Sequence, residues 1–103
     1  MARQLQTVLC ADVRATLQSM LPSMIRVYTI DDGRWGSYDS ETGIIYVSRS
    51  KHWLSTGLDE AELADTLVHE IVHKLMGHYN GQPHSDAHAQ DFRDKMASCG
   101  FPQ

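Results

Sequence analysis

The residues of this chain that could do chemistry cluster around a His-Glu-x-x-His pattern formed by His69, Glu70 and His73. On a helix, side chains four residues apart lie on the same face one turn apart, so the two imidazoles can reach one metal ion. Glu70 lies beside them and is placed to accept a proton from a metal-bound water. Imidazole is a common zinc ligand, so the pattern predicts a zinc site.

A catalytic zinc needs three protein ligands and one open position, so a further ligand must come from elsewhere in the chain. The candidates lie downstream: His78, His84, His88 and the aspartates that follow. His78 comes only five residues after His73, and this spacing misses the H-x-x-G-x-x-H continuation of metzincins. We favour His88, because on a helix it shares one face with Phe92 and Met96, which can anchor it.

The elements before the motif are predicted to be one helix and a small sheet. Residues 3–21 carry leucine and valine at four-residue spacing, which predicts an amphipathic helix that ends at Pro22. Residues 25–30 are rich in β-branched side chains and predict a strand, and residues 34–39 and 43–48 predict a hairpin. Together they predict an antiparallel sheet of about three strands. Residues 51–57 are expected to be a connector.

The motif itself is expected on a helix that begins near Asp59, whose carboxylate can cap it, and that ends at Gly77. A last helix is predicted from Ser85 to Cys99, with Gly100 as its stop and His88 on its buried face. The order of elements predicts an α+β fold in which the last helix carries the third ligand.

Composition narrows the class of protein. With 103 residues, 42% of them hydrophobic, the chain predicts a single domain over residues 1–103. A net charge of −4 argues against the broad basic surface of a strong nucleic-acid binder, and any such affinity is expected to be weak. A basic segment at residues 49–53 is interpreted as a solvated strand end. We expect no signal peptide and no membrane span.

The two cysteines, Cys10 and Cys99, lie far apart and belong to no C-x-x-C pair. This spacing favours reduced cysteines in a cytoplasmic protein over a disulfide scaffold.

Three segments resemble the SprT-like zinc metallopeptidase domain: Ile45–Ser48, Leu63–His73 and His88–Phe92. The last motif of that family usually reads His-Gly-x-x-Phe, and here Ala89 replaces the glycine. The resemblance implies a minimal gluzincin-like fold, zinc held by His69, His73 and His88, and Glu70 as the general base. We expect neither the zinc ribbon nor the DNA-binding tail that many relatives carry.

The predicted function is therefore zinc-dependent hydrolysis of peptide bonds in a protein or peptide substrate. Residues 44–48 are a candidate edge for binding the substrate backbone, and His78 and Tyr79 are candidates for stabilising the oxyanion. The alternative is a zinc-binding regulatory or interaction module without turnover, with DNA association as one variant. A closed structural site has four protein ligands, and the sequence offers only three well-placed ones.

Overall fold

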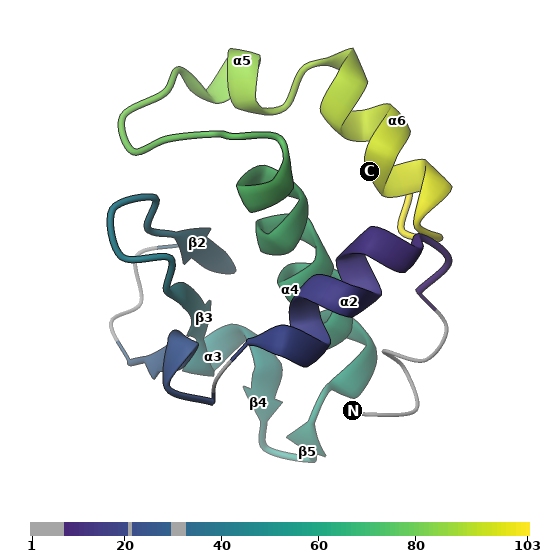
Figure 1. Ribbon diagram of the computed structural model, residues 1–103. Helices are drawn as coiled ribbons and strands as arrows, with labels where there is room; N and C mark the ends of the chain where they lie inside the picture. The colour runs from purple at the N-terminus through teal and green to yellow at the C-terminus, as the bar shows by residue number, and fades with distance from the viewer. Residues whose placement is uncertain (1–7, 21, 30–32) are drawn as a thin grey trace.

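The helix that carries the motif, α4 (Glu60–Leu75), runs through the middle of the computed structural model (Figure 1). The structure describes residues 8–20, 22–29 and 33–103. Two further helices, α2 (Ala11–Ser19) and α6 (Gln90–Ser98), pack against α4, and strands β2 (Gly36–Tyr38) and β3 (Ile45–Ser48) also contact it. The motif helix is thus enclosed by its neighbours, which explains why so much of it is apolar.

The remaining elements are short. They are the 3-10 helix η1 (Pro22–Met24), strand β1 (Ile25–Tyr28), helix α3 (Arg49–His52), strands β4 (Trp53–Leu54) and β5 (Gly57–Leu58), and helix α5 (His84–Ala87). This order of helices and strands confirms the predicted α+β class.

The main sheet has three strands in the order β1-β3-β2. The predicted antiparallel hairpin of β2 and β3 is confirmed, but β1 pairs with β3 in parallel, so the prediction of a wholly antiparallel sheet is wrong. The strands β1 and β2 follow each other in the sequence but lie on opposite sides of β3. β3 therefore lies in the centre with both edges paired, and it cannot be the substrate-binding edge that we expected.

The N-terminal helix is shorter than predicted within the described residues. It begins at Ala11, and the predicted residues 3–7 and 21, like the end of the predicted strand and turn at residues 30–32, lie outside the described part. Val13 of the predicted apolar stripe is buried, but Leu9 precedes the helix and is 70% exposed. The four-residue spacing of apolar side chains therefore predicts the buried face of this helix only from Ala11 onward.

Both predicted ends of α4 are confirmed. The carboxylate of Asp59 accepts a hydrogen bond from the backbone N–H of Glu62 at 3.2 Å, which satisfies one donor of the first turn. After the helix, Gly77 adopts a φ of 73°, a conformation that glycine reaches without the steric cost of a side chain. These caps set where the histidine pair lies along the helix axis.

The last predicted helix is broken in two. Ala89 has an extended backbone, with a ψ of 178°, so the chain leaves α5 at His88 and begins α6 at Gln90. His88 therefore lies at the junction of the two helices and not within one, which corrects the prediction. Phe92 and Met96 are nevertheless fully buried on the expected face of α6.

The connector at residues 51–57 is also more ordered than expected. It contains the end of α3 and a two-stranded hairpin of β4 and β5, and His52 is fully buried instead of solvated. The Nδ1–H of His52 donates to the carbonyl of Ser48 at 2.6 Å, and the hydroxyl of Thr66 on α4 donates to its Nε2 at 2.7 Å. This ring joins α3 to the motif helix and is a structural histidine, not a metal ligand.

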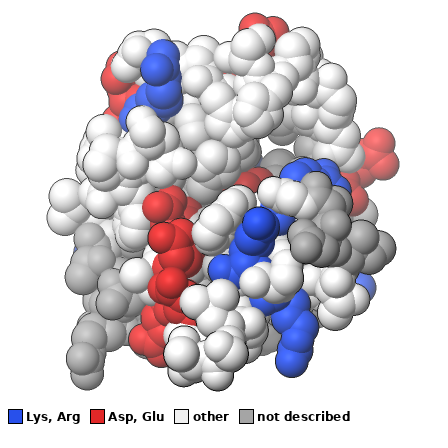
Figure 2. Space-filling view, turned by 180° about the vertical axis from the view of Figure 1, so that it is seen from behind, with Lys and Arg blue, Asp and Glu red and all other residues white. Residues whose placement is uncertain are grey.

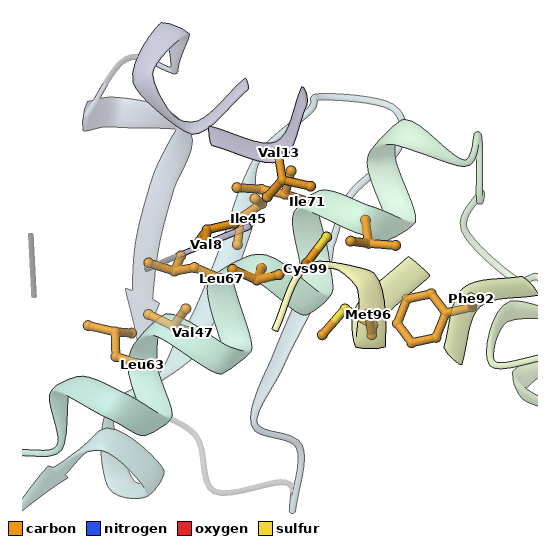
Figure 3. Packing of buried hydrophobic residues seen from close by; sticks show 12 residues of the cluster. Val8, Val13, Ile45, Val47, Leu63, Leu67, Ile71, Phe92, Met96 and Cys99 are labelled. Atoms are coloured by element: carbon orange, nitrogen blue, oxygen red, sulfur yellow. The ribbon is translucent and has the colours of Figure 1, made fainter. Parts of the chain in front are cut away.

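The hydrophobic core gathers side chains from α2, β3, α4 and α6 around the motif helix (Figure 3). Its buried members are Val8, Val13, Ile45, Val47, Leu63, Leu67, Val68, Ile71, Val72, Phe92, Met96 and Cys99. Because α4 supplies five of these twelve side chains, packing of the core fixes the rotation of α4 and so the direction of its histidine face.

A disulfide joins Cys10, just before α2, to Cys99, just after α6, so the prediction of unpaired cysteines is wrong. The Cα atoms lie 4.7 Å apart although the residues are 89 positions apart in the sequence. The backbone N–H of Leu9 also donates to the carbonyl of Cys99 at 3.0 Å. The tertiary fold brings the start of α2 and the end of α6 together, and sequence spacing cannot predict such a pairing.

Two surface features bear on the class of protein. Among the described residues, no helix combines the length and the apolar content needed to cross a bilayer. On the face seen in Figure 2, a column of acidic side chains runs beside a band of basic ones, so this face carries both signs of charge.

We predict that replacing both cysteines, Cys10→Ser with Cys99→Ser, lowers the free energy of unfolding by about 2–5 kcal/mol, because the bridge closes a long loop in the unfolded chain. Urea denaturation of the oxidised protein and of the double variant measures the difference. Reduced wild-type protein is the control and should match the variant. Equal unfolding free energies for oxidised and reduced wild type would contradict the prediction.

Candidate metal centre

Three histidines lie together at the surface of α4 that faces α6. His69 and His73 lie one turn apart on α4, and His88 reaches them from the junction of α5 and α6. One ring nitrogen from each of the three lies within 4.8 Å of the others, and this is the group that could hold a metal ion among the residues that the structure describes. The three predicted ligands are thus brought together.

The nitrogens that meet are the Nε2 atoms. Nε2 of His69 lies 3.0 Å from Nε2 of His73 and 3.1 Å from Nε2 of His88. A tetrahedral zinc with Zn–N bonds of about 2.0–2.1 Å separates its nitrogen ligands by about 3.3–3.4 Å. The two separations from His69 are within a few tenths of an ångström of that value, and all three nitrogens lie within 4.8 Å of one another, so the group could hold a metal ion.

The opposite nitrogen of each ring is held by the protein. Nδ1 of His88 donates to the carbonyl oxygen of His84 at 3.0 Å, and Nδ1 of His73 lies 2.6 Å from Nδ1 of His78. Nδ1 of His69 lies 3.1 Å from Oε1 of Gln103. Partners on Nδ1 set the ring orientation of a metal-binding histidine and raise its basicity, so all three rings are oriented toward one point.

Phe92 forms the floor beneath these rings. Its ring stacks on that of His73, with centroids 4.4 Å apart and planes 14° apart, and it meets the edge of His69 at 4.8 Å. Because Phe92 is fully buried, its position is set by the core. The resemblance and the helical face both indicated this residue, and its contacts explain why it accompanies the third histidine.

Burial keeps the three imidazoles neutral. It lowers the pKa of His69 to about 4 and that of His73 to about 3, and the neighbouring histidines add to both shifts. Burial also lowers the pKa of His88. Neutral imidazole is the form that binds metal, so the lowered pKa values favour coordination at neutral pH.

Glu70 lies beside the cluster and is buried, with its Oε2 3.9 Å from Nε2 of His69. Burial raises the pKa of Glu70 to about 8, and the positive charge of Arg34 opposes this rise. A cation held by the histidines would favour the carboxylate form of Glu70. The carboxyl group is therefore placed where a metal would convert it from an acid into a base.

A cleft of about 550 Å³ opens above the cluster. Gln103 and three segments line it: residues 34–38 around β2, the face of α4 from Glu62 to His73, and the loop and short helix between His78 and His88. His69, Glu70 and His73 all reach this cleft, so a molecule in it would meet the histidines and the carboxyl group together.

Gly36 allows β2 to lie directly against α4. A Cβ at this position would fall 2.7 Å from Cγ2 of Thr66 and 2.8 Å from the carbonyl oxygen of Tyr46. Such distances are too short for any side chain, so only glycine permits this approach. Sequence reasoning missed Gly36, and a glycine inside a predicted strand is the signal that could have found it.

The other predicted candidates have different places. His84 and His78 lie outside the ligand group. The backbone carbonyl of His84 accepts a hydrogen bond from Nδ1 of His88, and the ring of His78 makes a hydrogen bond with Nδ1 of His73. His78 and Tyr79, the candidates for the oxyanion, both line the cleft. Gln103 was missed, because its contact with His69 spans 34 positions of sequence.

No protein-family model, no curated protein and no solved structure matches this chain. The resemblance to SprT-like domains therefore stays a prediction from the three motifs.

We predict that the purified protein binds about one zinc ion per chain and that His88→Ala removes most of it, because a three-histidine site would lose one of its ligands. Metal content after dialysis measures this. His84→Ala is the matched control: it removes the neighbouring imidazole but keeps the carbonyl that holds His88, so zinc should be retained. Zinc lost from the His84 variant but not from the His88 variant would overturn the assignment of the third ligand.

We predict that Gly36→Ala costs about 1–3 kcal/mol of stability, because the added methyl group must push β2 away from α4. Urea denaturation measures the loss, and Ser37→Ala on the same strand is the control. Adding Thr66→Ser removes the clashing methyl and keeps the hydroxyl that binds His52, so it should restore part of the stability. An unchanged unfolding free energy in Gly36→Ala would show that β2 does not lie this close to α4.

Proposed function

We propose that this protein is a zinc-dependent metallopeptidase in which His69, His73 and His88 hold the metal and Glu70 is the general base. The observation that supports it most is the meeting of three Nε2 atoms beside a buried carboxyl group, at the wall of an open cleft. Three protein ligands leave one coordination position for water or substrate, as catalytic zinc sites do.

In this proposal the side chains of the protein transfer the protons and orient the metal ligands. Zinc, when bound, supplies a Lewis acid that lowers the pKa of water and polarises a carbonyl group. Glu70 accepts a proton from the attacking water at Oε2 and delivers it to the amine as the carbon–nitrogen bond breaks. The partners on Nδ1 hold the three imidazoles in place throughout.

A peptide substrate would bind along β2. This strand lies at an edge of the sheet, and its three residues Gly36, Ser37 and Tyr38 line the cleft. An edge strand offers unpaired backbone groups to an extended peptide, which can add to the sheet as a further strand. β2 thus replaces the β3 segment expected from the sequence, and it brings the peptide past Glu70.

Membership of the SprT-like family is part of this proposal and is supported by the motifs and by the α+β order of elements. A cytoplasmic location is not part of it, because that expectation depended on unpaired cysteines and disulfides persist mainly in oxidising compartments. The partners proposed are protein or peptide substrates. The two bands of opposite charge in Figure 2 give no support to strong nucleic-acid binding.

The rival function is a zinc-binding regulatory or interaction module without turnover. The observation in its favour is that the side chain of Gln103 already occupies part of the cleft wall next to His69. A module of this kind would bind zinc as tightly as the enzyme but would hydrolyse nothing. Activity and metal content, measured on the same sample, separate the two.

We predict that Glu70→Gln reduces peptide hydrolysis by about 10²–10⁴-fold and leaves zinc content unchanged, because the amide keeps the shape of the carboxylate but cannot accept the proton. Cleavage of unfolded protein substrates by zinc-loaded wild type and variant, read by mass spectrometry, measures this. Glu62→Gln, on the same helix and at the cleft, is the control and should cleave normally. Zinc-loaded wild type that cleaves no substrate would favour the regulatory module.

A further inference from the structure

The side chain of Gln103 bridges two residues on one face of the motif helix, Asp65 and His69. We propose that Gln103, oriented by Asp65, is a positioning residue that fixes the tautomer of His69 and so aims an unprotonated Nε2 at the metal site. This inference depends on the metal site of the proposed function, but not on peptidase activity.

The surroundings of Gln103 determine which way its amide points. Its Nε2, which carries two hydrogens, lies within hydrogen-bonding distance of three acceptors: the carboxylate of Asp65 at 3.2 Å and the backbone carbonyls of Phe101 at 3.1 Å and Pro102 at 3.4 Å. The carbonyls can only accept hydrogen bonds, and so can the ionised carboxylate. A flipped amide would set its own oxygen against these acceptors, so Oε1 must be the atom that faces His69.

This orientation decides where the proton of His69 lies. The amide oxygen accepts only, and it lies 3.1 Å from Nδ1 of His69, so Nδ1 must carry the hydrogen. In a neutral imidazole the other nitrogen is then bare. Nε2 of His69 therefore presents a lone pair toward His73 and His88.

His88 reaches the same state by a different contact. Its Nδ1 donates to the carbonyl of His84, so its Nε2 is also bare. The two bare nitrogens lie 3.1 Å apart, and two lone pairs at that distance repel unless a cation lies between them. Gln103 thus keeps Nε2 of His69 unprotonated, and with Nε2 of His88 it forms a pair of lone-pair donors that suits a metal ion.

The segment that carries Gln103 is anchored in the fold. The backbone N–H of Phe101 donates to the carbonyl of Met96 at 3.0 Å, and its side chain packs against the core. The core therefore holds this segment beside α4, where Asp65 and His69 lie one turn apart. Gln103 is exposed, so its removal is expected to leave the fold intact.

The tautomer can be read directly in metal-free protein. Long-range proton–nitrogen NMR correlations at pH 8 distinguish Nδ1–H from Nε2–H in each imidazole. We expect His69 as Nδ1–H in wild type and a shift toward Nε2–H in Gln103→Ala, while His88 keeps Nδ1–H in both. His69 found as Nε2–H in wild type would overturn the proposal.

Zinc affinity tests the consequence. Competition with a chromophoric chelator should show that Gln103→Ala weakens zinc binding by about 10–100-fold, the size expected when a partner of a ligating histidine is lost. Asp65→Ala should weaken it less, and the double variant should match Gln103→Ala alone if Asp65 acts through the amide. Gln18→Ala, an exposed glutamine on α2, is the control.

The outcomes separate this inference from the function it depends on. Zinc binding that is equal in wild type and Gln103→Ala, with the His69 tautomer unchanged, overturns the positioning role and leaves the peptidase untouched. Zinc binding weakened as expected, in a protein that cleaves nothing, upholds the positioning role and rejects the peptidase. A wild type that binds no zinc rejects both.

Discussion

The candidate metal site depends on three imidazole nitrogens that lie close together while burial favours the neutral form of their rings. Two of the rings come from one helical turn of α4, and the third arrives from the junction of α5 and α6, 15 positions after His73. Phe92 makes this possible, because it is buried in the core and stacks on His73 at the same time. The packing of α6 on α4 therefore also assembles the donor set.

Burial shifts the pKa values of the acid and the bases of this site in opposite directions. It lowers the pKa of the histidines, which keeps their nitrogens free for coordination, and it raises the pKa of Glu70 to about 8. A cation at the histidines would reverse the second effect and leave the first in place. A bound cation would therefore favour the carboxylate form of Glu70, because it would offset the cost of burying the charge.

The rest of the fold holds the walls of the cleft against α4. Gly36 brings the edge strand β2 into contact with the helix, His52 ties α3 to Thr66, and the disulfide ties α2 to α6. A chain of this size buries a modest core, so such cross-links between segments distant in sequence are needed to keep the wall positions fixed. They lie outside the ligand set and join the elements that surround it.

The sequence by itself determined what is local. A four-residue spacing on an apolar helix placed His69 and His73 on one face, Asp59 and Gly77 marked the helix ends, and the periodicity after His88 predicted a buried Phe92. The pairing of β1 with β3, the Cys10–Cys99 bridge, the break at Ala89 and the approach of Gln103 were decided by the tertiary structure. The strand pairing, the disulfide and the Gln103 contact each join segments that are far apart in the chain, and the break at Ala89 lets His88 reach α4. No local pattern encodes which distant segments the packed core brings together.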